Sequence, residues 1–224
     1  GVTVPSTRLA QDWQSIQHID LVPNYIEADK YLKTAPQPHE GVILGWGGSF
    51  SHLQSFTDSG LAIALRRVCQ ARKQVQVLIC GDRRVFDAIN IPANQKMYQP
   101  WVSAEEWPQS LARFDIGMAP LAGEYDQRRS WIKVLEYMLM KIPWAASDGA
   151  AYAELSDFGH LVENTPAAWE NTLLEMIDHL DDCRRTANET AYKFAIQQNV
   201  DENVDQILAV YSAIAERNGI EFSG

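Results

Sequence analysis

The sequence has little cysteine and no long apolar run. Its three cysteines, Cys69, Cys80 and Cys183, form no Cys-x-x-Cys pair, so reduced buried thiols explain them better than a disulfide framework or a zinc site. No apolar stretch reaches the roughly 20 residues that span a bilayer. The start GVTVPSTRLA also lacks the charged and apolar regions of a signal peptide. We therefore expect a cytoplasmic protein.

Positive charge is also scarce, with 19 Lys and Arg against 29 Asp and Glu and a formal net charge of −10. Such a chain repels phosphate backbones, and no basic stripe compensates, which disfavours a nucleic-acid role. A small anionic ligand remains compatible, because backbone amides and one or two cations suffice to hold a diphosphate. The glycine motifs of NAD enzymes and P-loop ATPases are missing, which disfavours both classes.

What the sequence does contain is the pattern of βαβ units around a parallel sheet. Short β-branched apolar runs alternate with stretches of helical period. The runs VILGW and VLIC are apolar without alternation, so these strands should be buried on both faces, with helices on both sides of the sheet. The clearest strands are 41–46, 75–80, 114–120 and 142–147, and the helices expected between them are 51–71, 103–114 and 130–140.

The two ends of the chain differ from this central pattern. Near the amino end, VTVPS and IDLVPN are typical of short strands, each followed by a helical stretch, and APQPHE is a Pro-rich linker. After Thr165 the chain is almost entirely helical in period, in three successive segments.

The first candidate site is the segment GWGGSFSH (45–52), where a strand ends in a glycine pair and a Ser that opens a long helix. Glycines let a backbone approach a ligand closely, and the free amides at a helix start favour an anion. A plain tight turn would use the same glycines, so both interpretations stay open. His52 in this segment is interpreted as structural.

The second candidate site is the stretch 128–152, whose helix carries only two interior charges, Lys133 and Glu136. They lie on adjacent turns of one face in an apolar setting, so both need partners. One interpretation is a mutual ion pair on a partly exposed edge. The other places them in the cleft at the carboxyl ends of the strands, with Lys133 on a phosphate and Glu136 accepting hydrogen bonds from two vicinal hydroxyls.

The order GWGGS, CGD, YQPWVSAEEWPQSLARFDIGMAPL and SWIKVLEYMLMKIPWAASDGAAYAEL resembles the carboxyl-terminal, donor-binding domain of family-four (group 1) glycosyltransferases of the GT-B fold. The resemblance runs from about Val42 to Trp169. It implies an α/β, Rossmann-like parallel sheet with helices on both faces, the C-terminal half of a GT-B architecture, and a helical C-terminal tail. Residues 1–40 would be an inter-domain crossover segment, 41–164 the nucleotide-sugar-binding core, and 165–224 C-terminal helices packing on that core.

The resemblance also implies a donor site. The glycine loop would lie against the diphosphate, Glu136 would hold the ribose hydroxyls, and Pro100 to Val102 would border the base. Arg129 and Lys133 would supply positive charge near the phosphates. The full set of expected donor-binding residues is Gly47, Gly48, Ser49, Arg83, Trp101, Val102, Arg129, Ser130, Lys133 and Glu136.

Two departures from the family pattern concern charge. Arg128 stands where a second family glutamate contacts the donor sugar, which leaves the sugar open. The Arg and Lys pair that the family has after the first strand is not evident, and Arg83, Arg84 or Lys133 would substitute for it.

The implied activity is that of a bacterial retaining glycosyltransferase of the hexosyltransferase type, using a UDP-, GDP- or ADP-sugar and an unknown acceptor, without cofactor or metal. Catalytic groups and any peripheral membrane contact are expected in an N-terminal acceptor-binding domain absent from this chain, which alone should be inactive. Two alternatives stay open. One is a Rossmann-type nucleotide-binding or interaction module without transfer chemistry, favoured by Arg128, and the other is a fragment of an NDP-sugar epimerase.

Overall fold

The structure is a computed structural model that describes residues 2–220. Residue 1 and residues 221–224, the extreme ends of the expected segments 1–40 and 165–224, lie outside the described residues. The main sheet has six parallel strands in the order β5-β4-β3-β6-β7-β8. Their bounds are β3 (Val42–Gly48), β4 (Val75–Gly81), β5 (Lys96–Gln99), β6 (Ile116–Ala119), β7 (Trp144–Ser147) and β8 (His160–Val162). The expected Rossmann-like α/β fold is confirmed.

The four strands expected from apolar runs are β3, β4, β6 and β7, and they form the centre of the sheet. The prediction missed the two edge strands, β5 and β8. Their sequences KMYQ and HLV are short and mostly half-buried. A strand with few buried positions carries little periodic signal, which is why neither edge was visible in the sequence.

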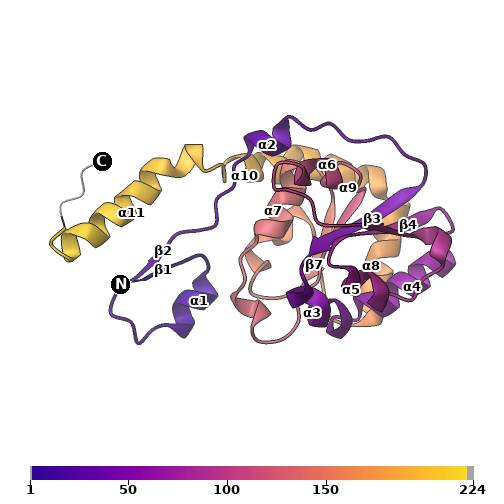
Figure 1. The fold of residues 1–224 in the computed structure, drawn as a ribbon, viewed down its shortest axis with the longest axis horizontal. Helices are drawn as coiled ribbons and strands as arrows, with labels where there is room; N and C mark the ends of the chain where they lie inside the picture. The colour runs from indigo at the N-terminus through magenta and orange to yellow at the C-terminus, as the bar shows by residue number, and fades with distance from the viewer. Residues whose placement is uncertain (1, 221–224) are drawn as a thin grey trace.

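Helices cover both faces of this sheet. One face packs against α3 (Leu53–Asp58), α4 (Leu61–Ala71), α5 (Arg83–Ala88) and α8 (Pro166–Asp178). The other packs against α2 (Asp29–Leu32), α6 (Trp107–Leu111), α7 (Ile132–Leu139) and α10 (Tyr192–Ile196), with α9 (Leu180–Thr186) joining α8 to this layer. In Figure 1, α3, α4 and α5 lie below β3 and β4, and α2 and α6 lie above them.

The stretch 51–71, expected as one helix, is divided. Phe50–His52 form a 3₁₀ turn, α3 follows, and the chain then turns at Gly60, whose φ is +85°. A side chain there would also meet the backbone of Pro166 at 2.6 Å, so only glycine fits. The glycine loop therefore leads into a short turn, and the long helix α4 begins only at Leu61.

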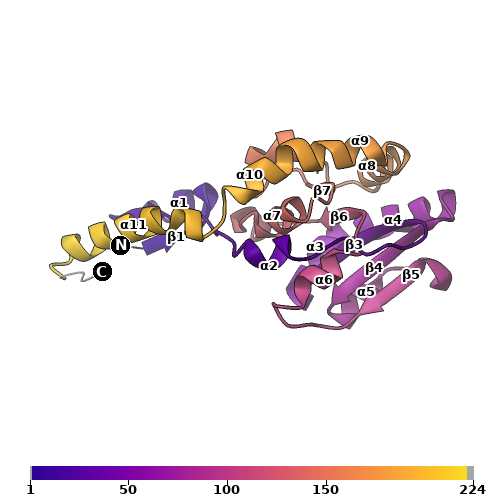
Figure 2. The same cartoon turned by 90° about the horizontal axis from the view of Figure 1, so that it is seen from above.

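A second, two-stranded parallel sheet stands apart from the main one. It pairs β1 (Val2–Val4) with β2 (Ile19–Leu21), and α1 (Thr7–Asp12) connects them. The last helix, α11 (Val204–Arg217), extends away from the main sheet and lies beside this small sheet in both Figure 1 and Figure 2. An ion pair between Arg217 and Asp20 joins them. No helix within residues 2–220 combines the length and apolar character that crossing a membrane requires.

Candidate functional site

The site lies where the order of the main sheet reverses. The chain runs from β3 outward to β4 and β5, then returns to β6 on the other side of β3. In open parallel sheets, ligands bind in the crevice that such a reversal opens at the carboxyl ends of the strands. A cavity of about 380 Å³ lies there, lined by Tyr31, Gly47, Gly48, Cys80, Gly81, Pro100, Trp101, Val102, Ser103, Ala104, Trp107, Lys133 and Glu136.

A larger groove of about 930 Å³ is a weaker candidate. It lies around the amino ends of β3 and β6, and its buried carboxylate is already satisfied. Asp115 accepts a hydrogen bond from the Ile43 amide at 2.8 Å and pairs with Arg184 and with His39, the latter at 3.4 Å. The carboxylate of Asp115 is thus paired with cations of the same groove, whereas Lys133 and Glu136 line the smaller cavity without an ion pair to each other.

Glycines shape the floor of the 380 Å³ cavity. A Cβ on Gly47 would come within 2.2 Å of the Trp107 ring, and one on Gly81 would come within 2.5 Å of the Gly48 carbonyl oxygen. Gly81 also has a φ of +103°, which disfavours any other residue. Because Gly47 has no side chain, the Trp107 ring can lie against the backbone of β3. Because Gly81 has none, the end of β4 can lie close to the end of β3.

Glu136 projects from α7 into this cavity, and its carboxylate is held on one side. Its Oε1 accepts hydrogen bonds from the Tyr31 hydroxyl at 2.8 Å and from the Trp107 indole N–H at 3.1 Å. Burial raises the pKa of the Glu136 carboxyl, while Lys133 and the two donors act against that rise.

Lys133 lies one turn earlier on the same helix. Its ammonium donates to the Gly47 carbonyl at the end of β3 and sits 5.4 Å from the centre of the Trp46 ring. Burial lowers the pKa of this ammonium, and the nearby Glu136 opposes that shift. Lys133 and Glu136 therefore do not form the mutual ion pair that was one interpretation of the sequence. Lys133 binds a backbone carbonyl, and Glu136 binds Tyr31 and Trp107.

His52 and Arg129 lie near Lys133, beside the glycine loop. The His52 ring packs edge-on against Trp46, with centroids 6.1 Å apart, and its Nδ1 is buried without a hydrogen-bond partner among residues 2–220. Arg129 lies near enough to influence His52, and its Nε donates to the buried Asp126 at 2.7 Å. Burial, together with Lys133 and Arg129, lowers the pKa of His52 to about 4. The neutral imidazole is therefore the dominant form at neutral pH.

Replacing His52 with glutamine is expected to reduce the loss of stability in acid. The folded-state pKa of about 4 lies below the ordinary value of 6.5, so the unfolded chain takes up a proton first as the pH falls through this window. In the wild-type chain the difference removes about 2 to 3 kcal/mol of unfolding free energy between pH 6.5 and pH 4. Urea unfolding at pH 7 and pH 4 measures this loss.

The exposed His18 provides the matched control, since His18→Gln should leave the acid loss as large as in the wild-type chain. The pKa of His160 is also lowered by burial, but this residue contributes equally in all three proteins. An acid loss in His52→Gln equal to that of the wild-type chain would contradict the assignment.

The structure brings together six of the ten expected site residues around the cavity: Gly47, Gly48, Trp101, Val102, Lys133 and Glu136. Arg129 and Ser130 line a neighbouring cavity of about 340 Å³, where the Ser130 hydroxyl accepts a hydrogen bond from Asn24. The Ser49 hydroxyl is hydrogen-bonded to Ser51 at 2.7 Å.

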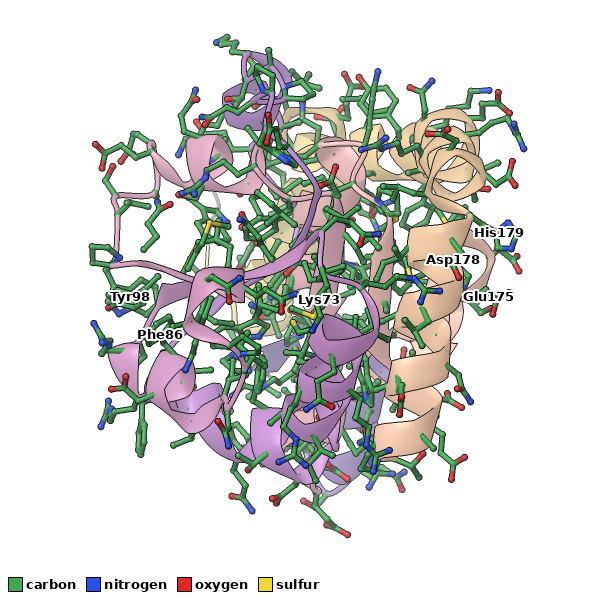
Figure 3. The ribbon with its side chains drawn as sticks, turned by 90° about the vertical axis from the view of Figure 1, so that its right-hand side faces the viewer. Lys73, Phe86, Tyr98, Glu175, Asp178 and His179 are labelled. Atoms are coloured by element: carbon green, nitrogen blue, oxygen red, sulfur yellow. The ribbon has the colours of Figure 1, made fainter. Side chains whose placement is uncertain are left out.

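Arg83 is not brought to the cavity. Its guanidinium pairs with Asp87 at 3.0 Å and lies over the rings of Phe86 and Tyr98, which Figure 3 shows side by side at one edge of the molecule. Arg128 is also turned elsewhere. It pairs with Asp12 of α1 and donates to the Glu124 carbonyl.

The sequence interpretation missed Tyr31 and Trp107, although both bind Glu136 directly. Trp107 follows the expected base-bordering turn by a few residues, and this proximity was the one sequence signal that pointed to it. Tyr31 lies in the irregular amino-terminal part, where nothing in the sequence pattern connects it with α7. Among the described side chains, no three His, Cys, Asp or Glu gather in a way that could hold a metal ion.

No protein-family model and no curated protein matches this chain. Solved structures do match it. HepE of Anabaena, in complex with UDP and glucose, has a TM-score of 0.74 at 17% identity, over 94% of this chain and 62% of HepE. A glycosyltransferase from Rickettsia africae has a TM-score of 0.71 at 17% identity, over 95% of this chain and 63% of its own. Sucrose-phosphate synthase from Thermosynechococcus elongatus has a TM-score of 0.73 at 14% identity, over 95% of this chain and 58% of its own.

These matches establish the fold that the sequence motifs imply, that of the GT-B glycosyltransferases. The chain spans less than two thirds of the length of each of these proteins. HepE has also been solved with UDP-glucose, at 18% identity to this chain.

Proposed function

We propose that this chain is the donor-binding part of a retaining glycosyltransferase of the hexosyltransferase type, and that it binds the nucleoside diphosphate of an NDP-sugar in the 380 Å³ cavity. The observation that carries the proposal is that a half-buried carboxylate, Glu136, and a half-buried ammonium, Lys133, line the same cavity at the sheet reversal. Acceptor binding and the remaining catalytic groups belong to a further domain. UDP in the HepE structures supports the ligand class.

The proposed role of Lys133 and its neighbours is to stabilise negative charge electrostatically. When the sugar leaves, negative charge develops on the diphosphate, and preorganised donors placed at that point lower the barrier. The ammonium of Lys133, which reaches from α7 to the end of β3, would stabilise this charge from the cavity, with Arg129 and the His52 imidazole beside the same loop. Glu136 would accept a ribose hydroxyl, and the exposed ring of Trp101 would border the base.

A Rossmann-type nucleotide-binding module without transfer chemistry is the second candidate. Arg128 favours it, because this residue stands where the related enzymes have a sugar-contacting acid and is tied to Asp12 instead of facing a cavity. Product formation by a longer protein that includes the acceptor-binding part separates the two candidates, and it also separates transfer from epimerisation.

Both candidate functions require that the chain binds a nucleoside diphosphate, and thermal unfolding with 1 mM UDP, GDP or ADP tests this binding. One of the three is expected to raise the Tm by about 5 °C, since a ligand at 100 times its Kd adds about 2.7 kcal/mol of stability. Glu136→Gln should remove most of this shift, whereas Glu175→Gln on α8 (Figure 3) should preserve it. An unchanged Tm with all three diphosphates would overturn the proposed function.

A further inference from the structure

The carboxylate of Glu136 is saturated on one oxygen and open on the other. Oε1 receives two donors, the Tyr31 hydroxyl and the Trp107 indole N–H. Of the residues that the structure describes, none donates to Oε2, although Glu136 lines the 380 Å³ cavity. A carboxylate offers about four acceptor positions, so the positions that remain are those on the cavity side.

Both partners of Oε1 can act only as donors toward a carboxylate. The indole N–H has no acceptor capacity. Burial and the neighbouring Glu136 raise the pKa of Tyr31, so its hydroxyl keeps its proton and donates. Because both donors point at Oε1, any proton taken up by the carboxyl must go to Oε2, where it would prevent a ligand hydroxyl from donating.

Tyr31 comes from a part of the chain remote in sequence from α7. It lies on the single-turn helix α2, which packs against α7 in Figures 1 and 2. The start of this turn is fixed by a hydrogen bond from the Ala28 amide to the Asn199 side chain at 3.2 Å. Just before the turn, Ile26 and Asn199 form an isolated parallel β-bridge. The Tyr31 side chain is only 8% exposed, so its hydroxyl is fixed in place.

We propose that Tyr31 and Trp107 are positioning residues that hold Glu136 by Oε1, so that Oε2 accepts the ribose hydroxyls and the site discriminates ribose from 2′-deoxyribose. The inference rests on the proposed function and adds to it a specificity for the sugar of the nucleotide. Without the two donors the Glu136 side chain would be free to turn, and the ribose would lose an acceptor fixed in advance.

The test compares a nucleoside diphosphate with its 2′-deoxy form, using whichever of UDP, GDP and ADP stabilises the wild-type chain most. The wild-type chain should bind the ribose form at least tenfold more tightly than the deoxy form. In Tyr31→Phe this preference should fall to about threefold or less, mainly because the ribose form binds more weakly. The acid limb of the binding profile should also move to higher pH, since Glu136 loses a hydrogen bond to its ionised form.

Tyr98→Phe is the matched control. Its hydroxyl donates to the Gly81 carbonyl at 2.9 Å, close to the same cavity but without contact with Glu136, so the ribose preference should be retained. Trp107→Phe, which removes the other donor, should lower the preference as Tyr31→Phe does and provides a second test if that variant does not fold.

The outcomes separate the two proposals. If the wild-type chain binds a diphosphate but shows no ribose preference, or if Tyr31→Phe and Trp107→Phe both keep the preference, this inference is overturned while the donor site stands. If no diphosphate binds to the wild-type chain, the proposed function itself is overturned, and this inference with it.

Discussion

Replacing Lys133 with methionine is expected to weaken the binding of a nucleoside diphosphate about 100-fold. The methionine side chain is close in length to that of lysine but carries no charge, so the packing of α7 beside Trp46 is largely preserved. Contacts between a buried ammonium and a phosphate are charge-assisted, and truncating one partner of such a contact costs about 2 to 5 kcal/mol. Calorimetric titration of the purified variant measures the loss.

The size of this effect follows from how few cations face the 380 Å³ cavity. Arg83 is occupied by Asp87, and Arg128 by Asp12, so neither replaces the missing charge. Lys73→Met is the control, because Lys73 is exposed on the face shown in Figure 3, where the chain enters the amino end of β4. If Lys133→Met binds within threefold of the wild-type chain, Lys133 does not contact the diphosphate.

The central strands could be predicted because burial on both faces leaves a continuous apolar run. In β3, Ile43 packs into the core on one side of the sheet, and Leu44 and Trp46 pack into the core on the other. A strand with this environment has no polar positions to confuse the pattern. The edge strands lack that property, and the break of the long helix at Gly60 depends on the approach of Pro166, which is distant in sequence.

The candidate site was predictable only in part, for a related reason. Lys133 and Glu136 stand out because two charges in an apolar helix require partners, whatever those partners are. The identity of the partners is a property of tertiary structure. Glu136 is held by Tyr31 and Trp107, which are 105 and 29 residues away in the sequence.

The partners of Arg83 and Arg128 were likewise not predictable from the sequence pattern. Arg83 satisfies its charge with Asp87 one helical turn later, a local pairing that competed with the expected role near the phosphates. Arg128 is held by Asp12, a residue from the small amino-terminal unit. A sequence pattern identifies residues that need a partner, and the chain topology decides which partner is within reach.

Replacing Gly45 with alanine is expected to lower the free energy of unfolding by about 3 kcal/mol, the upper end of the cost of overpacking a core. A Cβ at this position would lie 2.0 Å from Cγ of Phe114, so the ring lies flat against the backbone of β3. The neighbouring residue in the sheet is Gly117, where a Cβ would meet the Tyr137 ring at 2.5 Å. Two paired glycines thus accommodate two aromatic rings.

A double-mutant cycle tests whether this contact is the cause. Phe114→Ala removes the ring and should itself cost about 3 to 5 kcal/mol. In that background, however, Gly45→Ala should cost less than about 1 kcal/mol, because its Cβ has space. Gly149→Ala is the control, since its Cβ would meet only the flexible Gln127 side chain, at 3.1 Å. Urea unfolding measures the free energy of unfolding of the wild-type chain, Gly45→Ala, Phe114→Ala, the double variant and Gly149→Ala. If Gly45→Ala costs the same with and without the Phe114 ring, contact with that ring is not the cause of the loss.

The Gly45 substitution should also reach the donor site. The Phe114 ring packs edge-on against Trp107, with centroids 6.4 Å apart, and Trp107 in turn donates to Glu136. A ring pushed away from β3 therefore moves toward the indole that fixes the carboxylate. We expect Gly45→Ala to weaken diphosphate binding at temperatures where the variant is still folded, while Gly149→Ala leaves binding unchanged. Loss of stability with full retention of affinity would show that the glycine serves packing alone.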